Sequence, residues 1–141
     1  MFGARQGCDS IDMPQDTAPI KVFLAEDSPL MRERVGAMLA ARAMEIVGFA
    51  QTPQGCIDGI LASHPDVVVL DVQLGDGSGL EVLRTVRQKE PRIEFVVFTI
   101  NAGPAFRKRY LAEGARRFLD KATEFDQLVN SVERAARIIA S

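Results

Sequence analysis

The sequence VVVL at residues 67–70, followed by Asp71, decides the fold class. Four consecutive apolar residues, three of them β-branched, are typical of a strand buried on both faces, because a half-buried strand would alternate apolar and polar side chains. A strand of this kind lies inside a parallel sheet that helices cover on both sides. The stretch therefore predicts the central strand of an α/β domain, with Asp71 at the carboxyl end of that strand.

Strand-like and helix-like segments alternate on both sides of this stretch. Each strand-like segment precedes a segment in which apolar residues recur at helical spacing; the strand-like segments are 20–25, 44–50, 67–70, 93–98 and 116–119. This alternation predicts a doubly wound, five-stranded parallel sheet with five helices. The strand order 2-1-3-4-5 is the leading candidate for five strands.

Local signals predict where some of the helices begin and end. The sequences SGLE at Ser78–Glu81 and TEFD at Thr123–Asp126 have the spacing of a capping box, so each predicts a helix start. His64, which a proline follows, is expected to end the second helix. The helix at residues 104–113 has the weakest apolar pattern, and its Tyr110 is expected at the surface or in an interface.

Length and composition limit the classes of protein that fit. The chain has 141 residues, enough for one domain; we expect a disordered tail at residues 1–19 and the domain at residues 20–141. The net charge of −2 gives no strong field for nucleic acid or an anionic membrane, and no apolar run approaches the ~20 residues of a membrane span. Cys8 and Cys56 lack a metal-ligand spacing, which fits a reducing cytoplasm.

Reactive side chains follow the predicted strands, at the edge of the sheet where ligands of such folds bind. They are Glu26, Asp27, Asp71, Thr99 and Lys121. Three carboxylates in one pocket repel each other, so a positive charge must lie close, and an all-oxygen donor set favours a hard cation such as Mg²⁺. A carboxylate beside Mg²⁺ can form an aspartyl phosphate, while a lysine offsets charge on the phosphoryl oxygens.

Four motifs in this order resemble the receiver domain of two-component response regulators, including the single-domain chemotaxis type. The motifs are LAEDSPLMR at Leu24–Arg32, VVVLDVQLGDGSGLEVL at Val67–Leu83, VVFTIN at Val96–Asn101 and GARRFLDKATEF at Gly114–Phe125. The resemblance covers residues 20–140. It implies a flavodoxin-like fold and a phosphoryl switch that is not an enzyme with substrate turnover.

The resemblance also implies roles for particular residues. Asp71 would be the phosphoacceptor, and Thr99 and Lys121 would contact the phosphoryl group. The implied ligands of Mg²⁺ are Asp27, Asp71, the backbone carbonyl of Gln73 and, largely through a coordinated water, Glu26. Thr99 and Phe118 would form the switch pair.

Partners follow from the same resemblance. A histidine kinase or phosphotransfer protein would donate the phosphoryl group. A protein partner would bind the face formed by the fourth helix, fifth strand and fifth helix, and the receiver itself would be a monomer or weak dimer. Because no output domain follows Ser141, we expect a stand-alone, cytoplasmic protein that signals by protein contact and binds neither nucleic acid nor membrane.

Three positions depart from the family pattern. Gly75 and Ala122 stand where prolines are common, and the peptide isomer before Ala122 stays open at this point. Ile100 stands where a small residue is usual. We hypothesise that Ile100 narrows access to the phosphoryl group and slows its reaction with small donors or water.

Other kinds of protein fit parts of the pattern. A small phosphatase of the haloacid dehalogenase type also uses an aspartate after a strand, but that family has a second aspartate where this chain has Gln73. A phosphorylation-independent interaction module on a receiver-like fold is the other alternative, which Ile100 and Ala122 keep open. A flavin carrier is disfavoured because Glu26 and Asp27 would repel the phosphate of the cofactor.

Overall fold

The computed structural model describes residues 18–140, and the side chains up to residue 137. The tail expected at residues 1–19 falls almost entirely outside the described residues, so this expectation remains a prediction. No helix within residues 18–140 has both the length and the apolar character needed to cross a membrane.

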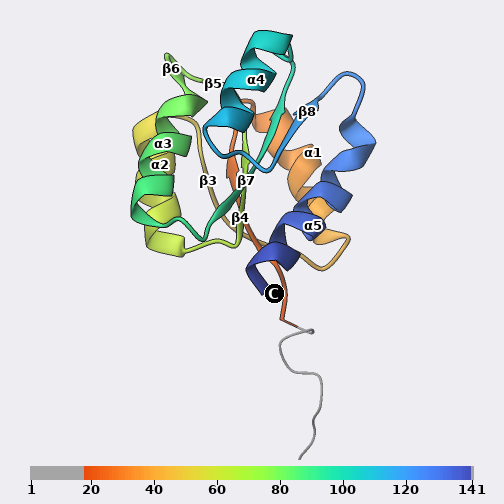
Figure 1. Ribbon diagram of the computed structural model, residues 1–141. Coiled ribbons are helices and arrows are strands. Elements are labelled where there is room, and N and C mark those ends of the chain that lie inside the picture. Colours follow the sequence, from red (N-terminus) through yellow and green to blue (C-terminus); the bar gives the residue numbers. More distant parts are fainter. Residues whose placement is uncertain (1–17, 141) are drawn as a thin grey trace, which may run out of the picture.

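Five parallel strands form one sheet in the order β3-β2-β4-β7-β8 (Figure 1). They are β2 (Lys21–Ala25), β3 (Glu45–Ala50), β4 (Val67–Leu70), β7 (Glu94–Thr99) and β8 (Arg117–Asp120). Counted along the chain, this order is 2-1-3-4-5, so the predicted doubly wound topology is confirmed. All four residues of β4 are buried between β2 and β7, which confirms the central position predicted from VVVL.

Five α-helices cover the two faces of the sheet (Figure 1). They are α1 (Pro29–Ala40), α2 (Pro53–Ser63), α3 (Gly79–Lys89), α4 (Pro104–Ala112) and α5 (Leu128–Ala140). One buried cluster packs α1 and α5 against the sheet, and a second packs α2, α3 and part of α4 against the opposite face. Burial of apolar side chains on both faces stabilises the sheet and leaves the carboxyl ends of the strands free to carry polar groups.

Most of the predicted helix signals are confirmed. Ser78 is the N-cap of α3, and its hydroxyl accepts a hydrogen bond from the backbone N–H of Leu80. His64 ends α2 in the left-handed conformation. The prediction of a capping box at Thr123–Asp126 is wrong. A 3₁₀ turn, η3 (Phe125–Gln127), precedes α5, and no side chain caps this turn. The carboxylate of Glu124 accepts from the Asp120 N–H instead and pairs with a guanidinium of α4.

Two features near the end of β4 differ from the sequence expectations. The expectation that Tyr110 lies at the surface or in an interface is wrong, because only 2% of this residue is exposed. Its ring lies 6.0 Å from that of Phe118, and its hydroxyl has polar partners inside the domain, so burial leaves no unpaired polar group. A small antiparallel hairpin, β5 (Gln73–Leu74) and β6 (Gly77–Ser78), was not predicted.

Candidate functional site

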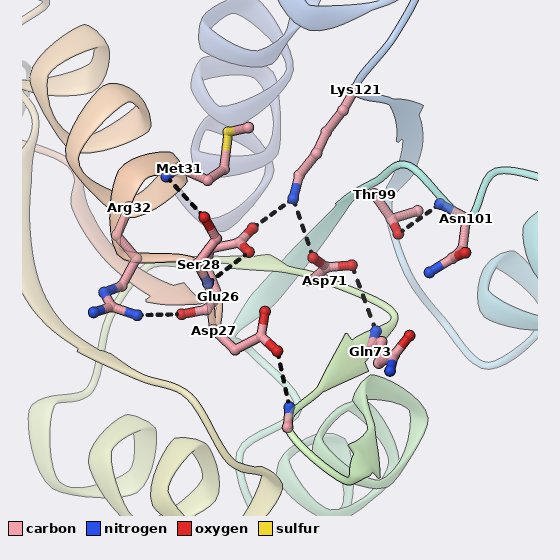
Figure 2. Close-up of polar contacts among 11 residues, drawn as sticks. Glu26, Asp27, Ser28, Met31, Arg32, Asp71, Gln73, Thr99, Asn101 and Lys121 are labelled. Carbon is pink, nitrogen blue, oxygen red and sulfur yellow. Dashed lines mark hydrogen bonds and ion pairs between the residues drawn. The ribbon is translucent and has the colours of Figure 1, made fainter.

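The carboxyl ends of two neighbouring strands bring the predicted acidic residues together. Glu26 and Asp27 directly follow β2, and Asp71 directly follows β4. One carboxylate oxygen from each of these three residues lies within 4.8 Å of the other two. Figure 2 shows the three side chains pointing toward one another. The donor atoms are all oxygens, which fits a hard divalent cation such as Mg²⁺ better than a soft metal.

Lys121 reaches this acidic group from the end of β8 (Figure 2). Its ammonium lies 2.6 Å from Oε1 of Glu26 and 3.1 Å from Oδ2 of Asp71, and its side chain is 7% exposed. Three carboxylates and one ammonium leave an excess of negative charge, which a bound divalent cation would offset. No cis peptide occurs in residues 18–140, so the bond between Lys121 and Ala122 is trans.

Burial raises the pKa of Glu26 above its ordinary value. The hydrogen bond from Lys121 opposes this shift, and the charge of Asp71 adds to it. Glu26 and Asp71 are each 8% exposed, so neither carboxylate can rely on water to disperse its charge. The folded chain therefore holds a proton on Glu26 more tightly than the unfolded chain does.

This pKa shift predicts a pH-dependent effect of Glu26→Gln. We expect the variant to have a higher free energy of unfolding than the parent at neutral pH without divalent cations, because it removes a buried charge. The difference should shrink as the pH falls through the raised pKa and vanish well below the ordinary value of 4.5, where Glu26 is protonated in both states. Urea unfolding at several pH values measures the difference, with exposed Glu33→Gln as the control. A less stable Glu26→Gln at neutral pH would mean that the Lys121 pair outweighs burial.

The β5–β6 hairpin lies against the acidic group. The N–H of Gly75 donates to Oδ2 of Asp27 at 3.1 Å, and the N–H of Gln73 donates to Oδ1 of Asp71 at 3.4 Å. Gly75 has φ +57°, a conformation that glycine adopts without strain. The hairpin thus orients two of the carboxylates, while the role of the Gln73 carbonyl as a metal ligand stays a prediction.

Arg32 of α1 fixes the turn that carries the acidic pair, a role that the sequence did not reveal. Its guanidinium donates to the backbone carbonyl of Glu26 at 2.8 Å and lies 4.6 Å from the centre of the Phe49 ring. Ser28 caps α1 by accepting from the Met31 N–H, and Pro29 occupies the first position of the helix. The start of α1 therefore holds the Glu26 backbone in place.

The predicted switch residues are both buried. Thr99 ends β7 with 0% exposure, and its hydroxyl oxygen accepts from the N–H of Asn101 at 3.1 Å (Figure 2). Phe118 is enclosed on β8, with the guanidinium of Arg107 5.2 Å from the centre of its ring. A switching motion of Thr99 and Phe118 stays a prediction. Ile100 is 71% exposed, and its proposed effect on access to the site also stays a prediction.

Gly79 is a second residue whose role the sequence did not reveal. A Cβ atom at this position would lie 2.2 Å from the backbone carbonyl oxygen of Asp71. The N–H of Gly79 donates to the carbonyl of Val72 at 2.7 Å. The first residue of α3 is thus packed directly on the backbone of the predicted acceptor, where no side chain fits. The sequence signal that could have indicated this close approach is a glycine directly after the N-cap serine of α3.

Comparison with protein families agrees with this geometry. The sequence model of the response regulator receiver domain matches residues 22–133. The chain belongs to this family. Among curated relatives, the receiver is 29% identical over 116 residues to response regulator GacA of Pseudomonas aeruginosa, which covers 82% of this chain and 54% of that protein. It is 27% identical to transcriptional regulatory protein DesR of Bacillus subtilis, covering 80% of this chain and 56% of that protein. The receiver spans about half the length of these relatives.

Solved receiver structures have the same fold. The receiver domain of the putative response regulator NarL from Mycobacterium tuberculosis matches with a TM-score of 0.78 and 28% identity, covering 84% of this chain and 97% of that one. The signal receiver domain of a putative Luxo repressor protein from Vibrio parahaemolyticus matches with a TM-score of 0.80 and 24% identity. This match covers 87% of this chain and 94% of that one. The predicted family and fold are therefore confirmed.

Proposed function

We propose that this receiver accepts a phosphoryl group on Asp71 from a histidine kinase or phosphotransfer protein. The observation that carries the proposal is the packing of Glu26, Asp27 and Asp71 around one point, with the Lys121 ammonium between Glu26 and Asp71. Asp27, Asp71 and the Gln73 carbonyl would hold Mg²⁺, and Glu26 would act through a coordinated water. When bound, the metal supplies positive charge beside the transferring phosphoryl group.

Three residues of the chain would take part in the phosphoryl transfer: Asp71, Lys121 and Thr99. An oxygen of the Asp71 carboxylate attacks the phosphorus of the donor phosphohistidine, and the bond from phosphorus to the imidazole nitrogen breaks. The imidazole leaves with the electron pair of that bond. The ammonium of Lys121, already 3.1 Å from Oδ2 of Asp71, stabilises negative charge on the phosphoryl oxygens. The hydroxyl of Thr99 would exchange its contact with Asn101 for one with a phosphoryl oxygen.

Phosphoryl uptake tests this proposal directly. The purified chain is incubated with acetyl phosphate and Mg²⁺, and intact mass is compared with a sample containing a chelator. We expect one added phosphoryl group that depends on the metal. If neither acetyl phosphate nor a histidine kinase phosphorylates the chain, a phosphorylation-independent interaction module replaces this proposal. Sustained turnover of a phosphate ester would favour the other alternative, a small phosphatase with an aspartate nucleophile.

Metal binding yields a separate prediction. We expect Mg²⁺ at ten times its dissociation constant to raise the free energy of unfolding by about 1.4 kcal/mol. Asp27→Asn should remove most of this increase, because Asp27 supplies one of the three converging carboxylates. Thermal unfolding with and without Mg²⁺ measures the effect. Asp58→Asn on α2 is the control, since the Asp58 carboxylate accepts from Gln54 of the same helix and lies outside the acidic group. Equal stabilisation of parent and Asp27→Asn would exclude Asp27 as a ligand.

Output is proposed to occur by protein contact at the face formed by α4, β8 and α5, from a monomer or weak dimer in the cytoplasm. Two proteins among the relatives are named a transcriptional regulatory protein and a protein-glutamate methylesterase/protein-glutamine glutaminase. Stand-alone action without nucleic acid therefore remains a prediction. A DNA-binding measurement on the phosphorylated chain checks it, and specific binding would contradict it.

A further inference from the structure

Tyr110 connects α4 to the segment that carries the predicted acceptor. We call residues 71–78, which run from Asp71 through the β5–β6 hairpin to the cap of α3, the acceptor segment. The Tyr110 hydroxyl lies 3.4 Å from the carbonyl oxygen of Val72 and 3.4 Å from Oγ of Ser78. These two partners stand near the two ends of the acceptor segment, so one side chain of α4 contacts both.

The surrounding backbone groups define a consistent arrangement of donors. The N–H of Leu80 donates to Oγ of Ser78 at 3.0 Å, which leaves the Ser78 hydroxyl proton free to donate to Tyr110. Tyr110 then donates to the carbonyl of Val72, which also accepts from the N–H of Gly79. In this arrangement both hydroxyls are satisfied, as expected for polar groups buried inside a protein.

The ring of Tyr110 extends this connection to the switch aromatic. It packs against Phe118 of β8, and the guanidinium of Arg107, also on α4, lies 5.2 Å from the centre of the Phe118 ring. Phe118 has no hydroxyl, so it cannot itself make a polar contact with the acceptor segment. Tyr110 therefore supplies a polar link between α4 and the acceptor segment, separate from the contact of Lys121 with Asp71 at the end of β8.

We propose that Tyr110 is a positioning residue that couples the placement of α4 to the geometry of the acceptor segment. The proposal deepens the proposed function and rests on it, because it names how the Asp71 site and the α4 face influence each other. Displacement of α4 pulls the hydroxyl away from Val72 and Ser78, and a buried hydroxyl without partners is unfavourable. A change at Asp71 that moves the acceptor segment therefore shifts α4, and a partner that binds α4 changes the site.

Tyr110→Phe is the direct test, because it keeps the ring and removes only the hydroxyl. We expect amide hydrogen exchange in residues 72–78 to become about fivefold faster, the size of one ordinary hydrogen bond, and the dissociation constant for Mg²⁺ to rise by a similar factor. Ser63→Ala is the matched control. It also removes a hydroxyl with a partner in the domain, the carbonyl of Gly59, but lies at the far end of α2.

Unchanged exchange in residues 72–78 of Tyr110→Phe would overturn the proposal and leave Tyr110 as a packing residue. A lower melting temperature with exchange in this segment no faster than in Ser63→Ala would do the same. The exchange comparison needs neither metal nor phosphoryl group. If the parent chain binds no Mg²⁺ and accepts no phosphoryl group, the proposed function fails, while the exchange result still decides whether the hydroxyl holds the segment.

Tyr110 also provides its own spectroscopic signal, since the chain contains one tyrosine and no tryptophan. We expect tyrosine emission to change when acetyl phosphate and Mg²⁺ phosphorylate the parent chain, and to stay constant in Asp71→Asn. Tyr110→Phe gives the background. Constant emission in a parent sample whose mass shows full phosphorylation would contradict the coupling.

Discussion

Gly79→Ala is expected to lower the free energy of unfolding by about 3 kcal/mol, because the new methyl group overlaps the backbone at the predicted acceptor. Its Cβ would lie 2.2 Å from the carbonyl oxygen of Asp71 and 3.2 Å from the carbonyl carbon. Neither atom belongs to a flexible side chain, so α3 or the end of β4 must shift. We expect phosphoryl uptake to fall as well, since that shift moves Asp71 relative to Asp27 and Lys121.

Gly103→Ala is the control for this substitution. Gly103 precedes α4, and beyond its two chain neighbours no atom of the described residues lies within 4 Å of a Cβ built on it, so its replacement should change stability little. Urea unfolding of the two variants gives the comparison, and intact mass gives the uptake. Equal stability of Gly79→Ala and the parent would show that the close approach of α3 to the Asp71 carbonyl is not required.

Lys121→Met is expected to slow phosphoryl uptake by about 100-fold, the usual effect of removing one preorganised group that stabilises transition-state charge. Methionine has a similar length but no charge, so the phosphoryl oxygens lose the ammonium now shared by Glu26 and Asp71. Initial rates with acetyl phosphate and saturating Mg²⁺ measure the effect. Lys108→Met, on the exposed side of α4, is the control.

Metal binding separates two readings of a slow Lys121→Met variant. We expect Mg²⁺ to raise its melting temperature at least as much as in the parent, because the carboxylates remain and lose a competing cation. Slow phosphoryl uptake with normal metal binding would show that Lys121 acts on the phosphoryl group and not on the metal. Uptake at the parent rate would exclude that role and leave Lys121 as a counter-ion of Glu26 and Asp71.

The fold and the convergence of the charged residues were predictable because both follow from patterns along the chain. The apolar run before Asp71 indicates a central strand, and the alternation around it indicates the strand order that brings Glu26, Asp27 and Lys121 to the same edge. The distances could not be predicted. The 2.6 Å contact between Lys121 and Glu26 depends on side-chain packing across residues far apart in sequence.

The features that the sequence did not reveal depend on contacts made only in three dimensions. Tyr110 lies on a helix with a weak apolar pattern, and its burial depends on Phe118 and the hydroxyl partners around Val72. The failure of the capping box at Thr123 has the same kind of cause, because Glu124 bonds to the end of β8 and to Arg107. The spacing of residues along the sequence does not show which hydrogen-bond partners from other parts of the fold will compete for a side chain.

The location of the added phosphoryl group tests the central claim most directly. The parent chain, Asp71→Asn and Asp76→Asn are incubated with acetyl phosphate and Mg²⁺, and the product is measured by intact mass and peptide mapping. Asp76 is the matched control, an exposed aspartate in the same acceptor segment. We predict one phosphoryl group on the parent and on Asp76→Asn, in the peptide that contains Asp71, and none on Asp71→Asn. Equal uptake by Asp71→Asn would contradict the assignment of Asp71 as the acceptor.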